Sequence, residues 1–125
     1  MMNANDAHIH ALPLFDYDDF LERMDGDADL LKEVIGIFLE DAPNLLSALG
    51  SAVRAGDAEA MEKAAHTLKG AAANISAKKL QQSAHIMQET IKKGRMAPVE
   101  KLFMEMETHY ELLDRALKSR LTQEK

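Results

Sequence analysis

The chain has 125 residues, a net charge of −6 at pH 7 and no cysteine. A chain of this length suits one domain. Its net negative charge argues against nucleic acid or an anionic membrane as the main partner. The lack of cysteine excludes disulfides, zinc–thiolate sites, iron–sulfur clusters and cysteine nucleophiles. Hydrophobic residues make up 46% of the chain but aromatic residues only 5%, so aliphatic side chains and methionine must build the core, which favours packed helices.

The N-terminal segment, residues 1–14, shows no periodicity and is expected to be a flexible arm. It lacks the basic and long apolar regions of a signal peptide, and nowhere does the chain hold the ~20 apolar residues that span a bilayer. We therefore expect a cytoplasmic protein without a membrane partner. His8 and His10 of the arm are interpreted as solvated side chains rather than metal ligands.

From residue 16 onward, apolar side chains recur at helical spacing. A short helix is predicted over residues 16–24, ending near Gly26. A longer helical stripe follows over residues 27–56, in which Pro43 is expected to break or kink the helix and Gly56 to stop it.

Three more helices complete the pattern. Asp57 is a good N-cap for a helix that reaches residue 73, and Ser76 can cap the helix that follows. Gly94 ends that helix, and Pro98 suits the first turn of the last one.

Because the connections are short, neighbouring helices should be antiparallel. The predicted fold is all-α, an antiparallel up-and-down four-helix bundle with a short additional N-terminal helix. The bundle is assigned to residues 15–121, and residues 122–125 are assigned to a C-terminal tail.

His66 is the first candidate site residue. The inward positions of its helix are Met61, Ala64, Ala65, Leu68 and Ala72. Since successive helical residues turn by about 100°, His66 lies about 200° from Leu68 and points outward. Neutral imidazole is a good nucleophile near pH 7. Its attack on a phosphoryl centre gives a labile phosphoramidate, so an exposed histidine suits a carrier that passes the group onward.

Three residues give this histidine a context. Gly70, one turn beyond His66, leaves the ring uncovered for another surface, although a glycine there would also relieve a tight helix contact. Lys69 can reach an anion held on the ring. Gln88 follows His66 by 22 residues (88 − 66), and a hairpin turn near residues 74–76 would place its amide beside the imidazole.

Residues 65–80, "AHTLKGAAANISAKKL", resemble the signature of histidine-containing phosphotransfer (HPt) domains of two-component phosphorelays. That signature runs His-Thr/Ser-Leu-Lys-Gly, then small residues, a turn and a leucine. The sequence departs from it at Ser76, where glycine is frequent, and at Ala71 and Ala72, where serine is common.

The resemblance implies a phosphoryl carrier rather than an enzyme. His66 would accept phosphate, usually at Nε2, Lys69 would support the phosphate, Gly70 would open the surface and Gln88 would orient the ring. The implied partners are response-regulator receiver domains and a hybrid sensor histidine kinase. The receiver would supply Mg²⁺, so a monomer of this chain would need no cofactor or metal of its own.

The receiver docking face is predicted around the histidine. It comprises Gly70, Glu59, Glu62, Lys63 and Ala73, which share the outward side of the helix with His66. A direct role for His85 or His109 is not expected, because neither has a Lys-Gly companion.

Other functions remain open from the sequence. An HPt-like module could dock receivers without carrying phosphate, or the chain could be the phosphotransfer domain of a chemotaxis-type kinase. A metal or redox bundle is disfavoured because Glu62 and Glu105 precede their histidines by four residues, whereas di-iron bundles use Glu-x-x-His. Eight methionines fit core packing better than haem ligation.

Overall fold

The computed structural model describes residues 12–123, which form five helices and no strand. The helices are α2 (Tyr17–Arg23), α3 (Ala28–Ala55), α4 (Ala58–Asn74), α5 (Lys78–Lys92) and α6 (Val99–Gln123). Residues 1–11, with His8 and His10, and residues 124–125 of the predicted tail lie outside the described residues.

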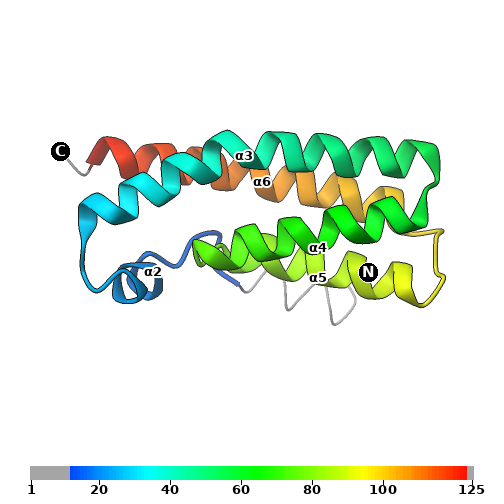
Figure 1. Ribbon diagram of the computed structural model, residues 1–125, viewed down its shortest axis with the longest axis horizontal. Helices are drawn as coiled ribbons and strands as arrows, with labels where there is room; N and C mark the ends of the chain where they lie inside the picture. Colours follow the sequence, from blue (N-terminus) through cyan, green and yellow to red (C-terminus); the bar gives the residue numbers. More distant parts are fainter. Residues whose placement is uncertain (1–11, 124–125) are drawn as a thin grey trace.

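The four long helices make the predicted bundle. Figure 1 shows α3 and α6 along one side and α4 and α5 along the other, with α2 at the end of the bundle near the α4–α5 turn. The fully buried large side chains come from every helix: Phe20, Leu31, Ile35, Leu49, Met61, Leu68, Ile75, Leu80, Met87, Met106, Leu113 and Leu117. The all-α fold expected from the apolar periodicity is therefore confirmed. Within residues 12–123, no helix has both the length and the apolar character needed to cross a membrane.

The sequence left a break or a kink open at Pro43. The break is wrong, because α3 runs through this residue without interruption. A proline leaves the carbonyl four residues earlier without its helical hydrogen bond. Pro43 is exposed, so water can satisfy that carbonyl. Figure 1 shows that α3 changes direction near its middle, so the helix bends there and continues.

Polar caps set the ends of α3 and α4 as the sequence suggests. The Asp27 carboxylate accepts a hydrogen bond from the Leu30 amide, and the Asp57 carboxylate accepts one from the Ala60 amide. Between these helices Gly56 has a left-handed φ of 67°, a conformation that glycine adopts without steric cost. The α3–α4 corner is thus fixed locally, and α4 starts in the register that places His66.

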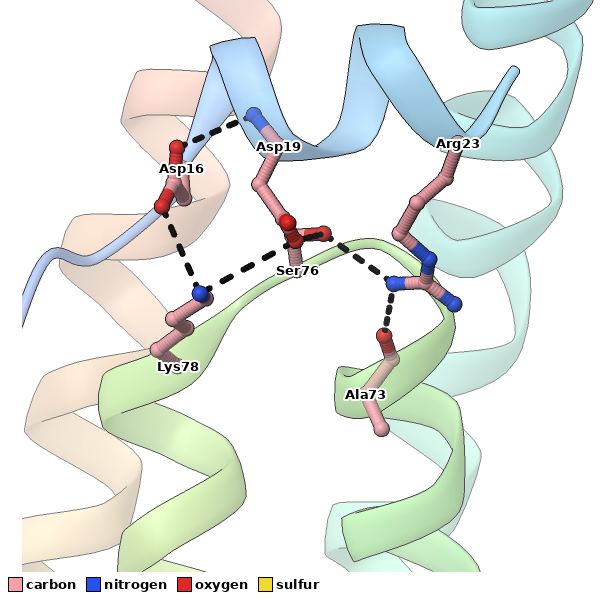
Figure 2. A network of polar contacts seen from close by, with 6 residues as sticks. All are labelled: Asp16, Asp19, Arg23, Ala73, Ser76 and Lys78. Carbon is pink, nitrogen blue, oxygen red and sulfur yellow. Dashed lines mark hydrogen bonds and ion pairs between the residues drawn. The ribbon is translucent and has the colours of Figure 1, made fainter. Parts of the chain in front are cut away.

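The α4–α5 turn, in contrast, is held by residues from α2 (Figure 2). Ser76 has a φ of 58° and is 2% exposed. Its hydroxyl donates to Asp19 Oδ2 at 2.6 Å and accepts from Arg23 Nη1 at 3.1 Å. Arg23 Nη1 also donates to the Ala73 carbonyl at 2.7 Å, at the end of α4.

Two further contacts tie α2 to this turn. The Asp16 amide donates to the Ser76 carbonyl at 3.0 Å. Lys78 Nζ lies 3.5 Å from Asp16 Oδ2 and 3.9 Å from Asp19 Oδ2. We call these contacts of Asp16, Asp19 and Arg23 with the turn the α2–turn network.

The expectation that Ser76 caps α5 is therefore wrong. The N-cap of α5 is Ala77, whose side chain offers no capping hydrogen bond. The first amides of a helix need outside acceptors, and the Lys79 amide finds one in the carbonyl of Pro13 at 3.1 Å. Pro13 thus contacts the bundle, although the sequence placed it in the flexible arm.

Candidate functional site

Helix α4 buries one face and presents the other to solvent. Met61, Ala65, Leu68 and Ala72 are buried, as the periodicity predicts, apart from Ala64, which is half-buried. His66 is exposed. Since α4 packs against both α3 and α5, the His66 ring lies on an open helix face bordered by these two helices.

Gln88 on α5 lies next to the His66 ring. Its Nε2 is 3.3 Å from His66 Nδ1, the contact expected from the 22-residue spacing. The Gln88 side chain is only 5% exposed, and its Oε1 is buried without a hydrogen-bond partner. The contact fixes the orientation of the ring, because Nδ1 faces the buried amide and Nε2 is the nitrogen left for a partner molecule.

Gly70 has open space where a side chain would be. A Cβ built on it meets no atom within 4 Å, so this glycine does not relieve a tight helix contact. A tight contact occurs instead at Gly50 of α3, where a Cβ would lie 2.9 Å from Phe103 Cζ of α6. The alternative explanation for Gly70 is therefore excluded, and the cleared surface beside His66 remains.

Lysine and glutamate side chains surround the histidine on α4. The half-buried Lys69 side chain forms no hydrogen bond or ion pair with the residues that the structure describes, so its ammonium is available to an incoming anion. Glu62 Oε1 lies 4.0 Å from Lys92 Nζ of α5. Glu59 and Lys63 are exposed, and Ala73 is half-buried.

A groove of about 620 Å³ lies between α3 and α4 beside the histidine. The α4 side is lined by His66, Thr67, Gly70, Ala71 and Asn74, with Ile75 beyond the helix. The α3 side is lined by Val34, Ile37, Phe38, Asp41, Asn44 and Leu45. The groove is therefore apolar along much of its length, and the predicted acceptor lies on its border.

The α3 residues of this groove were missed in the sequence. Ile37 is 52% exposed and Leu30, two turns earlier, is 41% exposed. Both lie outside the buried stripe of α3, which includes Ile35 and Phe38. An apolar residue outside the helical stripe, Ile37, was the available signal in the sequence for a contact surface. Of the predicted docking residues, Gly70 lines the groove, whereas Glu59, Glu62, Lys63 and Ala73 do not.

The other described histidines lie elsewhere in the bundle. His109 of α6 is 7% exposed, and its Nδ1 is 2.7 Å from Ser83 Oγ of α5. The Ser83 hydroxyl donates to the Lys79 carbonyl at 3.0 Å, and its contact with His109 joins α5 to α6. His85 is half-buried. Within residues 12–123, no three or more histidine, aspartate or glutamate side chains are grouped so that they could hold a metal ion.

Comparison with known proteins agrees with this geometry. The solved structures that share the fold include the following two. One is histidine-containing phosphotransfer protein B (HptB) from Pseudomonas aeruginosa PAO1, with a TM-score of 0.83 and 23% identity over 90% of this chain and 98% of that one. The other is the HPT domain of the Hpt sensor hybrid histidine kinase from Shewanella, with a TM-score of 0.77 and 20% identity over 92% of this chain and 97% of that one.

A search of curated protein sequences finds no match. The family model of the Hpt domain matches residues 33–116. The matched residues cover more than half of the chain and include both His66 and Gln88. The chain therefore belongs to the Hpt domain family, the phosphotransfer domains of two-component phosphorelays.

Proposed function

We propose that His66 is the phosphoryl acceptor of this Hpt domain and that it shuttles phosphate between receiver domains. The observation that carries the proposal is the exposed ring whose Nδ1 is bound by a buried amide at 3.3 Å. Such a ring is oriented without being enclosed, and a carrier needs both properties. A structural histidine would resemble His109, which is buried and bonded within the core.

The reaction is a displacement at phosphorus. The Nε2 lone pair of His66 attacks the phosphorus of a receiver's aspartyl phosphate, the N–P bond forms, and the P–O bond breaks with its electron pair returning to the aspartate carboxylate. Transfer to the next receiver reverses these bond changes. The unpaired Lys69 ammonium, one turn away on the same face, balances the negative charge of the phosphoryl oxygens.

The α3–α4 groove supplies a surface for the receiver. Phosphoryl transfer requires the partner's aspartate to come within bonding distance of Nε2, so the partner must cover the surface around the ring. Gly70 and the apolar side chains of the groove, Ile37 foremost, offer contact area there. Glu59, Glu62, Lys63 and Ala73 border the ring on other sides and tune partner choice by charge and shape.

In this role the protein is a monomeric cytoplasmic carrier that acts between a hybrid sensor kinase and a response regulator. Catalytic groups and Mg²⁺ come from the receiver, and the chain uses no cofactor of its own. The encounter is transient, since a relay needs the carrier to leave each partner after transfer.

The test is phosphorylation by a receiver domain carrying aspartyl phosphate. Wild-type protein is expected to gain acid-labile phosphate, whereas His66→Gln is expected to gain none while keeping its circular dichroism spectrum. His85→Gln is the matched control, because His85 is a half-buried histidine on α5 outside the proposed site, and it is expected to behave as wild type. Phosphate on His66→Gln would refute the assignment, and complete absence of labelling of the wild type by all receivers of the source organism would favour a docking module without phosphotransfer.

A further inference from the structure

Asp41 places a negative charge in the mainly apolar wall that α3 contributes to the groove. Its neighbours along this wall include Ile37, Phe38 and Leu45, and Asn44 is the other polar residue there. The Asp41 side chain is exposed and forms no hydrogen bond or ion pair with the residues that the structure describes. The groove therefore presents an unpaired carboxylate to any molecule that covers it.

Asp41 lies at the same level of the bundle as the cleared surface beside His66. Helices α3 and α4 run antiparallel from the corner at Gly56 (Figure 1). Asp41 precedes Gly56 by 15 residues (56 − 41), and Ala71 follows it by 15 (71 − 56), so Asp41 faces Gly70 and Ala71 across the groove that all three line. His66 is five residues before Ala71, about 8 Å along the helix axis. A partner that fills the groove to reach the ring therefore also covers Asp41.

A partner that covers Asp41 must compensate for the lost hydration of its carboxylate. This loss weakens binding unless a cation or a hydrogen-bond donor replaces the water. An apolar partner surface would match Ile37 and Phe38 but leave the carboxylate unpaired, and an acidic surface would repel it. A lysine or arginine beside an apolar patch satisfies both parts of the groove. Asn44, three residues further along α3, offers the same cation a carbonyl acceptor.

We propose that Asp41 determines which receiver domains dock, by pairing with a lysine or arginine that the receiver carries beside its apolar docking patch. This inference rests on the proposed function, since it concerns the partner of the same site. The receiver then meets opposite charges on the two helices, because Lys69 of α4 faces its aspartyl phosphate and Asp41 of α3 faces its cation. The two charges fix how the receiver lies on the groove, so a receiver with an acidic side chain opposite Asp41 is rejected.

Substitutions at Asp41 separate its charge from its shape. Asp41→Asn removes the charge and keeps the shape of the side chain, whereas Asp41→Lys reverses the charge. Because Asp41 is exposed and has no partner among the described residues, both variants should keep the circular dichroism spectrum and the thermal unfolding of the wild type. Glu40→Lys is the matched control. Glu40 is an exposed acidic residue of α3 that does not line the groove, and its reversal changes the net charge of the chain by the same amount as Asp41→Lys.

The first measurement is the dissociation constant of an unphosphorylated receiver domain, determined by fluorescence anisotropy at low ionic strength with the receiver of the source organism that binds the wild type most tightly. We expect about tenfold weaker binding for Asp41→Lys, about threefold weaker binding for Asp41→Asn and the wild-type affinity for Glu40→Lys. Added salt should reduce these differences, because it screens an exposed pair. Equal weakening by Asp41→Lys and Glu40→Lys would show an effect of net charge alone and would overturn the proposal, as would wild-type affinity in Asp41→Lys.

A charge exchange identifies the cation on the receiver. Each lysine or arginine on the receiver surface around its phosphorylatable aspartate is changed in turn to glutamate. One of these receiver variants should bind Asp41→Lys more tightly than it binds the wild type, because the pair is restored with its signs exchanged. If none of them does, the assignment of a cationic partner group is wrong.

Phosphoryl transfer separates this inference from the proposed function. Potassium phosphoramidate is a small phosphoryl donor that needs no docking surface, so it should phosphorylate the wild type and the variants at similar rates, whereas transfer from the receiver should slow as binding weakens. A slower reaction of Asp41→Lys with phosphoramidate would place the effect in the acceptor site and overturn the docking role. A wild type that binds receivers through Asp41 but gains no phosphate from them would refute the proposed function and support this inference.

Discussion

Ser76 Oγ donates a 2.6 Å hydrogen bond to Asp19 Oδ2, which joins residues 57 positions apart in the sequence. The bond connects α2 to the turn at the end of α4, the helix that carries His66. Ser76 holds a left-handed φ of 58°, a conformation that costs a non-glycine residue roughly 1–2 kcal/mol. The α2–turn network thus compensates for a serine at a position that would suit glycine.

Replacing Ser76 separates the strain from the hydrogen bonds. Ser76→Ala keeps the strained φ and loses the contacts with Asp19 and Arg23, so its free energy of unfolding should fall by about 1–2 kcal/mol. Ser76→Gly loses the same contacts but relieves the strain, so its free energy of unfolding should fall by less than that of Ser76→Ala. Urea unfolding followed by circular dichroism measures both. An alanine variant at least as stable as the glycine variant would contradict this account.

The pH dependence of stability should report on Asp19. The Ser76 hydroxyl, with Lys78 and Arg23, holds the pKa of the Asp19 carboxyl below 3.8 against the opposing effect of desolvation. Because the native pKa is the lower one, the unfolded state binds a proton first as the pH falls. The stabilisation by Asp19 is present above pH 3.8 and is lost as the pH falls through the native pKa.

The measurement compares unfolding of the wild type and Asp19→Asn as a function of pH. The difference in their free energies of unfolding should be largest near neutral pH and should shrink in acid. Asp18→Asn is the control, because Asp18 is exposed on the same helix and, among the described residues, forms no hydrogen bond or ion pair with the turn. A difference between wild type and Asp19→Asn that is constant over the whole range would show that the charge of Asp19 has no role.

Gly70 should show a trade between stability and transfer. Gly70→Ala places a methyl group in open space and should raise the free energy of unfolding by about 0.5–1 kcal/mol. Gly70→Gln should also preserve the fold but slow transfer from a receiver, because its side chain would cover the surface beside His66. Gly36→Gln on α3 is the control, since a Cβ there also meets nothing within 4 Å and Gly36 does not line the groove. Wild-type transfer by Gly70→Gln would show that the cleared surface is not needed.

Ile37 should contribute to receiver binding. Ile37→Ser removes a half-exposed apolar side chain from the groove. Its loss should weaken the free energy of receiver binding by about 1 kcal/mol, so half-maximal transfer should need a roughly fivefold to tenfold higher receiver concentration. Met104→Ser is matched in exposure, at 60% against 52% for Ile37, and lies on α6 outside the groove. Titration of both variants with a phosphorylated receiver measures the effect, and equal behaviour would exclude the groove as the docking surface.

A methyl group at Gly50 should lower the free energy of unfolding, whereas a methyl group at Gly70 should raise it. Gly50→Ala would place a Cβ 2.9 Å from the Phe103 ring, and such overpacking costs about 1–3 kcal/mol. A second change, Phe103→Leu, should recover part of the loss because it shortens the obstructing side chain. Thermal unfolding of the single and double variants gives the coupling energy between the two positions. A Gly50→Ala protein with the stability of the wild type would refute the close contact between position 50 and Phe103.

Local patterns in the sequence were sufficient for most of the bundle. Helix ends at Asp57 and Gly56 were predictable because capping and left-handed glycine act within a few residues. The meeting of His66 and Gln88 was predictable because a hairpin with a short turn fixes which positions face each other. The outward direction of His66 followed from helical geometry alone.

Features that depend on distant segments could not be predicted in the same way. Ser76 was expected to cap α5, but its hydroxyl bonds Asp19, and no local pattern indicates a partner 57 residues away. The α3 side of the groove was missed because its extent depends on how α3 and α4 pack. The choice between a break and a kink at Pro43 could not be predicted, since it depends on whether the helix position is exposed so that water can replace the missing hydrogen bond.

The residues needed for a stable bundle begin earlier in the sequence than the residues matched by the family model. The Pro13 carbonyl and the α2 residues of the α2–turn network both precede the matched region and contact the bundle. The family model begins at residue 33. Two contacts of the bundle come from earlier residues: the Pro13 carbonyl accepts a hydrogen bond from the Lys79 amide of α5, and Asp19 of α2 binds Ser76 in the strained α4–α5 turn. A fragment trimmed to residues 33–116 would keep His66 and Gln88 but leave Ser76 strained and the Lys79 amide without its acceptor. Expression fragments of this domain should therefore start before Pro13. Helix α4, which carries His66, then keeps the contacts with α2 that hold its C-terminal end.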